Sequence, residues 1–171
     1  MASTLKVNTI QHTGGTTGMT IDSTGRIKIP NIINFNVTGN GAWVDHGSTA
    51  TVYFKTSNQA VDIITNVGSC YDASTGRFTV PSGMDGLYQF NCMQNNDYSS
   101  SSRPGNFRCF VNNSLYAGIN FDPLDSHAGW FTHTLVGTLN LARNDTVRLY
   151  TSNAARVDNY NWNHWSMYLI G

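Results

Sequence analysis

The feature that most constrains the fold of this chain is a series of short strand-like runs, each followed by residues that favour turns. Clusters of Gly, Asn, Asp and Pro separate the runs, and no ten-residue stretch shows a convincing helical stripe. The spacing is typical of a β-sandwich. We therefore predict an all-β protein with about ten strands in its main domain. The expected strands are residues 32–37, 51–55, 61–65, 77–80, 87–93, 107–111, 115–119, 130–141, 146–151 and 162–170.

The composition supports strands and excludes several classes of protein. The 171 residues include 20 Asn, 19 Thr, 15 Ser and 16 Gly but no Glu, and the first four types weaken or compete with helices. Ten basic residues balance ten acidic ones, so no basic stripe is available for phosphates and we predict no nucleic-acid partner. No apolar run has the length of a signal peptide or a membrane span, so we expect a soluble protein made in the cytosol, without membrane insertion. The three Cys are expected to be reduced.

The first 30 residues differ from the rest and form a separate segment. They are rich in Thr and Gly and contain only brief β-like stretches. Such a segment cannot build a core alone, so we expect an arm (residues 1–30) that becomes ordered by packing on another chain or on its own head (residues 31–171). The apolar residues expected to attach this arm are Leu5, Val7, Ile10, Met19 and Ile21.

The run from Leu87 to Met93 is apolar on much of both faces. Tyr88, Phe90 and Cys92 alternate with a second set of residues that includes Leu87 and Met93. A strand of this kind is covered twice, once by the second sheet of a sandwich and once by something else. A neighbouring subunit is the natural cover, which favours an oligomer.

The block TNVGSCYDASTGRFTVPSGMDGLYQF, residues 65–90, resembles the signature of the complement C-one-q globular heads, whose jelly roll is shared with tumour necrosis factor. LNLARNDTVRLY, residues 139–150, resembles the family's strand–turn–strand element, with Asn144 where the family usually has Gly, and residues 164–171 resemble its closing strand. The resemblance covers roughly residues 31–171 and implies a jelly-roll head that forms a homotrimer around a threefold axis. The residues it suggests for the trimer interface are Tyr88, Phe90, Tyr150, Trp165 and Tyr168.

The arm has a resemblance of its own. Residues 2–27, ASTLKVNTIQHTGGTTGMTIDSTGRI, are similar to a leader found in virion structural and tail-fibre proteins of marine tailed bacteriophages, including those that infect cyanobacteria. This implies a virion protein assembled in the host cytoplasm, with other capsid, fibre or tail proteins as partners. A chain of 171 residues has no room for a long shaft, which favours a capsid decoration or head fibre over a tail-fibre tip. The alternative is a soluble glycan-binding, lectin-like module.

No catalytic motif is present, and we predict that the protein is not an enzyme and has no catalytic residues. Asp122 and Asp125, in the segment FDPLDSHAGW, are the one carboxylate pair that could hold calcium, and no other cofactor is expected. A depolymerase would also have to use this pair. Ordinary turn formation explains both residues equally well.

Two long polar segments are candidates for binding a host surface glycan. Residues 95–106 and 153–162 combine aromatic side chains with Asn, Asp and Arg, and loops on a rigid sandwich often carry ligand contacts. A solvated loop or a contact with another virion protein would look the same in the sequence. The glycan candidates are Tyr98, Arg103, Arg156, Asp158, Tyr160 and Trp162.

Overall fold

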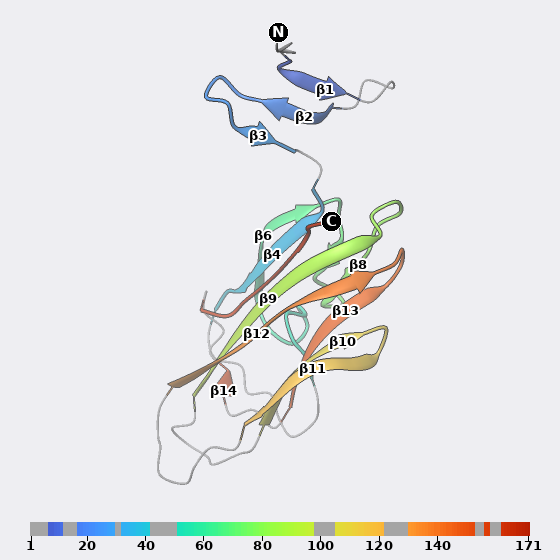
Figure 1. Ribbon diagram of the computed structural model, residues 1–171. Coiled ribbons are helices and arrows are strands. Elements are labelled where there is room, and N and C mark those ends of the chain that lie inside the picture. Colours follow the sequence, from blue (N-terminus) through green and yellow to red (C-terminus); the bar gives the residue numbers. More distant parts are fainter. Residues whose placement is uncertain are drawn as a thin grey trace. The chain divides into compact units, whose positions relative to one another are not determined.

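The computed structural model describes residues 7–11, 17–29, 32–41, 51–97, 105–121, 130–152, 156–157 and 162–171. These residues form strands and no helix, as predicted (Figure 1). The chain divides into two compact units. We call Met1–Ile32 the arm and Ile33–Gly171 the head.

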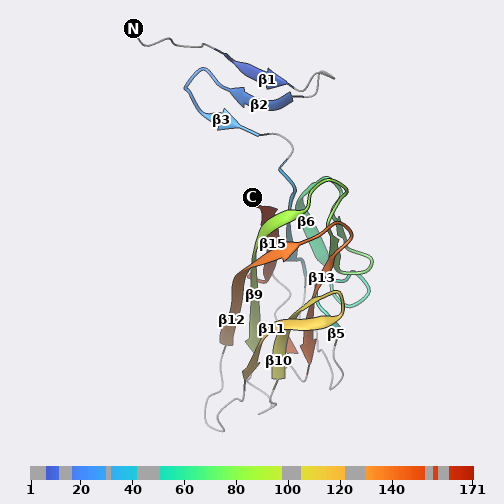
Figure 2. The same cartoon turned by 45° about the vertical axis from the view of Figure 1, so that its right-hand side comes forward.

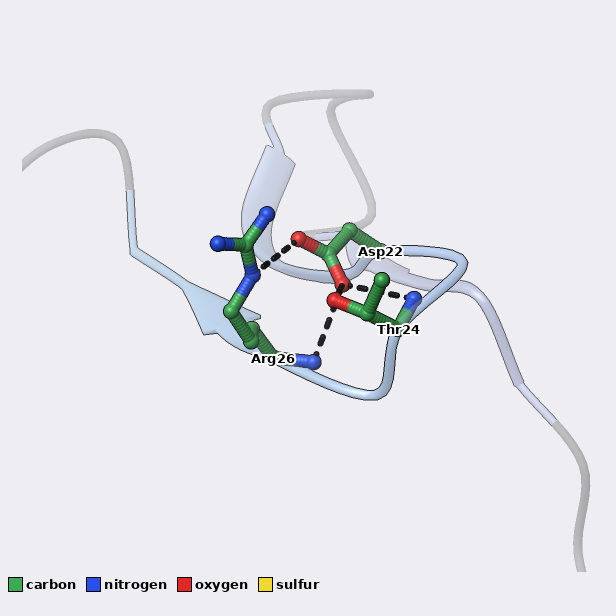
Figure 3. Close-up of polar contacts among 3 residues, drawn as sticks. All are labelled: Asp22, Thr24 and Arg26. Atoms are coloured by element: carbon green, nitrogen blue, oxygen red, sulfur yellow. Dashed lines mark hydrogen bonds and ion pairs between the residues drawn. The ribbon is translucent and has the colours of Figure 1, made fainter.

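The described part of the arm is a small antiparallel sheet. Its strands are β1 (Thr9–Gln11), β2 (Thr17–Ile21) and β3 (Ile27–Lys28), in the order β1-β2-β3. Asp22 closes the turn between β2 and β3 (Figure 3). Its carboxylate accepts hydrogen bonds from the backbone N–H of Thr24 at 2.9 Å, the backbone N–H of Arg26 at 3.0 Å and Nε of Arg26 at 2.8 Å.

The head contains two antiparallel sheets. We name the first the β9 sheet, with the order β12-β9-β15-β4-β6 and β14 paired to β9. Figure 2 shows β9 and β12 in one layer and β10, β11 and β13 in the other. The strands of the β9 sheet are β12 (Trp130–Leu141), β9 (Gly86–Asp97), β15 (His164–Leu169), β4 (Asn34–Gly39), β6 (Val61–Val67) and β14 (Arg156–Val157).

We name the second sheet the β13 sheet, with the order β11-β10-β13-β8-β7 and β5 paired to β13. Neighbouring strands are often distant in sequence, as in β13 beside β8 and β15 beside β4. All ten expected runs contain a strand of the structure. The strands of the β13 sheet are β11 (Ser114–Phe121), β10 (Gly105–Val111), β13 (Thr146–Ser152), β8 (Arg77–Thr79), β7 (Tyr71–Asp72) and β5 (Thr51–Val52).

The core of the head lies between the two sheets, because alternate residues of each strand face inward. Phe35 joins the layers: its ring stacks on Tyr71 with 4.8 Å between centroids and on Phe78 with 5.5 Å. The β9 sheet contributes Phe35, Val37, Tyr88, Phe90, Cys92, Leu135, Leu139, Trp165 and Met167 to this core, and the β13 sheet contributes Tyr71, Phe78, Phe107, Cys109, Val147 and Leu149.

Two turns have the backbone conformation that their residues favour. Asn112 and Asn113, with φ of 48° and 68°, form the two-residue connection between β10 and β11. Positive φ at both central residues gives the turn a twist that suits a hairpin. Asn144, between β12 and β13, has φ of 68°, a left-handed conformation that Asn adopts more readily than most other non-glycine residues.

Candidate functional site

The outer face of the β9 sheet is the first candidate surface. Along β9, Leu87, Gln89, Asn91 and Met93 are on the side away from the core, because Tyr88, Phe90 and Cys92 are buried between the sheets. The neighbouring strand β15 places Tyr168 opposite Gln89, Ser166 opposite Asn91 and His164 opposite Met93. The face is therefore a continuous surface built from the centre of the sheet.

Several large apolar side chains on this face are exposed to solvent. Val136 of β12, which pairs with Asn91, is 60% exposed. Leu87, Tyr168 and Ile170 are also exposed, and Ile170 donates its backbone N–H to the carbonyl of Leu87 at 2.8 Å. Apolar patches of this kind often mark surfaces that another molecule covers.

The same face also contains unsatisfied polar atoms. Ser166 pairs with Asn91 on one side and with Asn36 of β4 on the other. The Oδ1 atoms of Asn36 and Asn91 are both buried and lack a hydrogen-bond partner. Buried acceptors nearly always find a donor in proteins, so these two atoms are unsatisfied polar groups of this face.

Three of the five residues predicted for a trimer interface belong instead to the core of a single chain. Tyr88, Phe90 and Trp165 are 0%, 1% and 0% exposed. The hydroxyl of Tyr88 donates to the carbonyl of Met84 at 2.7 Å, so its polar atom is also satisfied within the head. The prediction therefore took the wrong face of β9 as the interface. Tyr88, Phe90 and Cys92 face the second sheet, and the less apolar set that includes Leu87 and Met93 faces outward.

The remaining two predicted interface residues lie on different sheets. Tyr168 is on the outer face of the β9 sheet, opposite Gln89. Tyr150 is half-buried on the outer face of the β13 sheet, where its ring meets Phe110 edge to face at 4.9 Å. The structure therefore does not bring the five residues together. Alternation in the run from Leu87 to Met93 separates the two sets of side chains but does not indicate which set faces outward.

The candidate glycan and metal residues are described only in part. Tyr98, Arg103, Asp158 and Tyr160, and the calcium candidates Asp122 and Asp125, lie outside the described residues. Arg156 is in β14, and Trp162, just before β15, is 54% exposed. Within the described ranges, no group of three or more His, Cys, Asp and Glu residues could hold a metal ion.

Burial affects the protonation of two histidines. His133 on β12 and His164 on β15 both have pKa values lowered from the ordinary 6.5, because desolvation disfavours the charged imidazolium. Burial therefore favours the neutral imidazole at both positions. His164 lies on the outer face of the β9 sheet between Met93 and Thr38.

The arm places most of its predicted attachment residues on one face. Ile10 pairs with Met19, and Ile21 pairs with Ile27, so these four side chains share one side of the small sheet. Ile10 and Ile27 are exposed, and Met19 and Ile21 are half-buried. Val7 is exposed as well, and Leu5 lies outside the described residues.

The described residues include no helix long and apolar enough to cross a membrane. No protein-family model matches the sequence, and no curated protein matches it either. Comparison with solved structures finds likenesses that cover 81–82% of this chain.

Three solved structures illustrate the likeness. The globular domain of zebrafish complement 1qA has a TM-score of 0.57 and 15% identity, covering 81% of this chain and 98% of that one. The Eiger TNF of S. frugiperda has a TM-score of 0.61 and 8% identity, covering 82% and 94%. Murine APRIL has a TM-score of 0.57 and 9% identity, covering 81% and 99%. The chain therefore has the jelly-roll fold of the C1q and TNF globular domains.

Proposed function

We propose that this chain is a non-enzymatic bacteriophage virion protein, a homotrimeric surface knob whose heads associate through the outer face of the β9 sheet. The observation that carries the proposal is that face, which combines exposed Val136, Leu87 and Tyr168 with the unpartnered Oδ1 atoms of Asn36 and Asn91. Exposed apolar side chains beside unsatisfied polar atoms suit a surface that a second copy covers. The jelly-roll fold supports this, because the family that residues 65–90 resemble forms trimers.

In this proposal, the arm attaches the knob to the particle. Its support is the resemblance of residues 2–27 to a phage virion leader, together with the apolar face formed by Ile10, Met19, Ile21 and Ile27. A sheet of three short strands has too little buried surface to be stable alone, so the arm gains from a partner. Neighbouring virion proteins are the proposed partner, on the capsid as a decoration or head fibre, with a tail-fibre tip as the second location. In either location the head faces outward and contacts the host cell surface.

The solution mass tests the trimer. Size-exclusion chromatography with light scattering should give about 56 kDa, three times the 18.8 kDa of one chain. The double variant Leu87→Asp/Val136→Asp should give a monomer, because it buries carboxylates in the proposed interface. Leu115→Asp is the matched control, since Leu115 is 56% exposed on the β13 sheet, and it should keep the trimer mass. A monomeric wild type, or a double variant of unchanged mass, would overturn the interface.

Immunogold labelling of particles produced from a genome that encodes this chain tests the virion role. We expect label on intact particles, and its position on capsid or tail decides between the two locations. Met19→Asp, on the apolar face of the arm, should abolish incorporation, whereas Thr20→Asp on the opposite face should not. Particles without label would contradict the virion role. A head that is trimeric but absent from particles would instead favour the free lectin-like module.

A further inference from the structure

The outer face of the β13 sheet carries three arginines on three neighbouring strands. Arg77 of β8 lies directly opposite Arg148 of β13. On the other side of β13, Phe110 of β10 lies opposite Arg148, and Arg108 lies opposite Tyr150. The alternate residues of these strands are buried in the core, so all three arginines are on the side away from it. Three of the seven arginines of the chain are therefore gathered on one sheet face.

Within the described residues, these arginines form no ion pair. None of the three forms an ion pair with another described residue, since the one ion pair within the described ranges joins Asp22 and Arg26 in the arm. Asp72 is opposite Arg77 in register, but its carboxylate accepts hydrogen bonds from Ser74 and Thr75 in its own turn. Like charges directly opposite each other in a sheet are destabilising, which an anion between them would relieve.

The polar contacts of the arginines leave donors free. Arg148 donates from Nη1 to the Tyr150 hydroxyl at 3.3 Å, and Arg108 donates from Nη2 to Oδ1 of Asn120 at 3.3 Å. The Nε atoms of Arg77 and Arg148 are buried and have no hydrogen-bond partner. The Nη–H groups of a guanidinium also form charge-assisted hydrogen bonds with the oxygens of a carboxylate or sulfate.

Two aromatic rings and a glycine lie beside the arginines on this face. Tyr150 and Phe110 contact each other edge to face between Arg108 and Arg148. Arg108 lies over Gly118 of β11, where an added Cβ would be only 2.9 Å from Cγ of the arginine. The face thus offers aromatic ring surface beside cationic groups. Aromatic rings of this kind pack against the apolar faces of sugars.

We propose that the outer face of the β13 sheet binds an anionic polysaccharide whose sugars bear carboxylate or sulfate groups. The arginines are spread over two strand spacings, roughly 10 Å, which suits repeated anions along a polymer better than one small oxyanion. An acidic peptide would be expected to add to a sheet edge through its backbone, and β13, at the centre of this surface, is paired on both sides. We name these residues, Arg77, Arg108, Arg148, Phe110 and Tyr150, the arginine face.

The arginine face is independent of the proposed trimer and of the virion role. It lies on the opposite sheet of the sandwich from the surface proposed for the trimer, and the two surfaces share no residue. It also uses none of the loop residues that the sequence suggested for glycan binding. The proposal therefore extends the proposed function without resting on it.

Binding of the full-length protein to polymers of known charge tests this inference. Isothermal titration with polygalacturonate and dextran sulfate should show binding that weakens as salt is added, and neutral dextran should not bind. Arg148→Gln should weaken binding about tenfold, the scale of one lost charge-assisted hydrogen bond. Arg143→Gln removes the same charge from the exposed turn before β13 and should change affinity less than about twofold.

Two further measurements separate specific binding from the effects of a poorly folded variant and of a general attraction between opposite charges. In wild-type protein, added polygalacturonate should shift the Nε–H resonances of Arg77 and Arg148 in a nitrogen-15 spectrum, and not that of Arg143. Polyaspartate should bind at least tenfold more weakly than polygalacturonate. Three results would overturn the proposal, whatever the solution mass of the protein. The first is a wild type that binds neither anionic polysaccharide, and the second is the same loss of affinity in Arg148→Gln and Arg143→Gln. The third such result is polyaspartate binding as tightly as polygalacturonate.

Discussion

Trp165 and Phe35 meet edge to face in the core of the head, with 4.7 Å between ring centroids and planes at 87°. Trp165 also meets Tyr71 edge to face at 5.6 Å, so one side chain of the β9 sheet contacts an aromatic residue of the β13 sheet. This arrangement makes Trp165 a residue that joins the two layers within one chain.

Replacing Trp165 by Ala should therefore lower the free energy of unfolding by about 3–5 kcal/mol, the range for a large aromatic side chain lost from a core. Guanidinium unfolding followed by circular dichroism measures it. Trp162→Ala is the matched control: Trp162 is 54% exposed, and its loss should cost no more than about 0.5 kcal/mol. If Trp165→Ala leaves the free energy of unfolding unchanged but alters the solution mass, Trp165 would instead belong to an interface between chains.

Tyr71 supports an unusual backbone conformation at Phe54. Phe54 has φ of 55°, rare for a non-glycine residue, and its carbonyl accepts a hydrogen bond from the Tyr71 hydroxyl while its N–H donates to Gln59 Oε1 at 3.1 Å. Tyr71→Phe leaves this buried carbonyl without its donor and should cost about 1–3 kcal/mol in urea unfolding. Tyr116→Phe is the control. It removes an exposed hydroxyl bonded to the Thr138 carbonyl, and should cost less than about 1 kcal/mol.

Asn144 can be tested as a left-handed turn residue. Because φ is 68° at this position, a β-branched side chain would be strained, and Asn144→Val should destabilise the head by about 1–2 kcal/mol. Asn144→Gly should be neutral or slightly stabilising, since glycine adopts this conformation without strain. Thermal unfolding of both variants should give a higher melting temperature for Asn144→Gly than for Asn144→Val. Equal melting temperatures would mean that the turn conformation is not under strain.

The three cysteines should be unreactive in the folded protein. Cys70, Cys92 and Cys109 are free and buried. Burial raises the pKa of Cys70 to about 11 and that of Cys109 to about 12, and raises that of Cys92 well above its ordinary value, so almost no thiolate exists at pH 8. Ellman's reagent should release negligible colour from the native protein and three equivalents after unfolding in guanidinium. Rapid modification of the native protein would contradict this burial.

The stability of the turn between β2 and β3 in the arm should depend on pH. Hydrogen bonds from Thr24 and Arg26 lower the pKa of Asp22 from 3.8 to about 2. A carboxylate with a lowered pKa stabilises the folded turn above pH 3.8, and this contribution is lost as the pH falls toward 2. The protection factor of the Thr24 amide, whose N–H donates to Asp22, should therefore fall over this range once the exchange rate is corrected for its intrinsic pH dependence. In Asp22→Asn, the protection factor should be lower at neutral pH and should lack this acid-dependent step. A Thr24 protection factor that does not change with pH in the wild type would rule out the role of Asp22.

Much of the fold could be predicted from local sequence patterns. Alternation and turn residues located all ten runs. The short strands β7 and β14 were missed, since two residues carry too little periodicity to be recognised. The likeness of the head to solved C1q and TNF domains agrees with the motif in residues 65–90.

The sequence by itself determined that the chain is all-β, where its head strands lie and which two sets of side chains alternate along β9. Only the tertiary structure decided which set is buried. Tyr88 and Phe90 face the core because the β13 sheet covers that side, and a period of two distinguishes two faces without saying which is inside. Strand pairing likewise placed Arg77 opposite Arg148, 71 positions apart in the chain, and no local pattern encodes a contact between such distant residues.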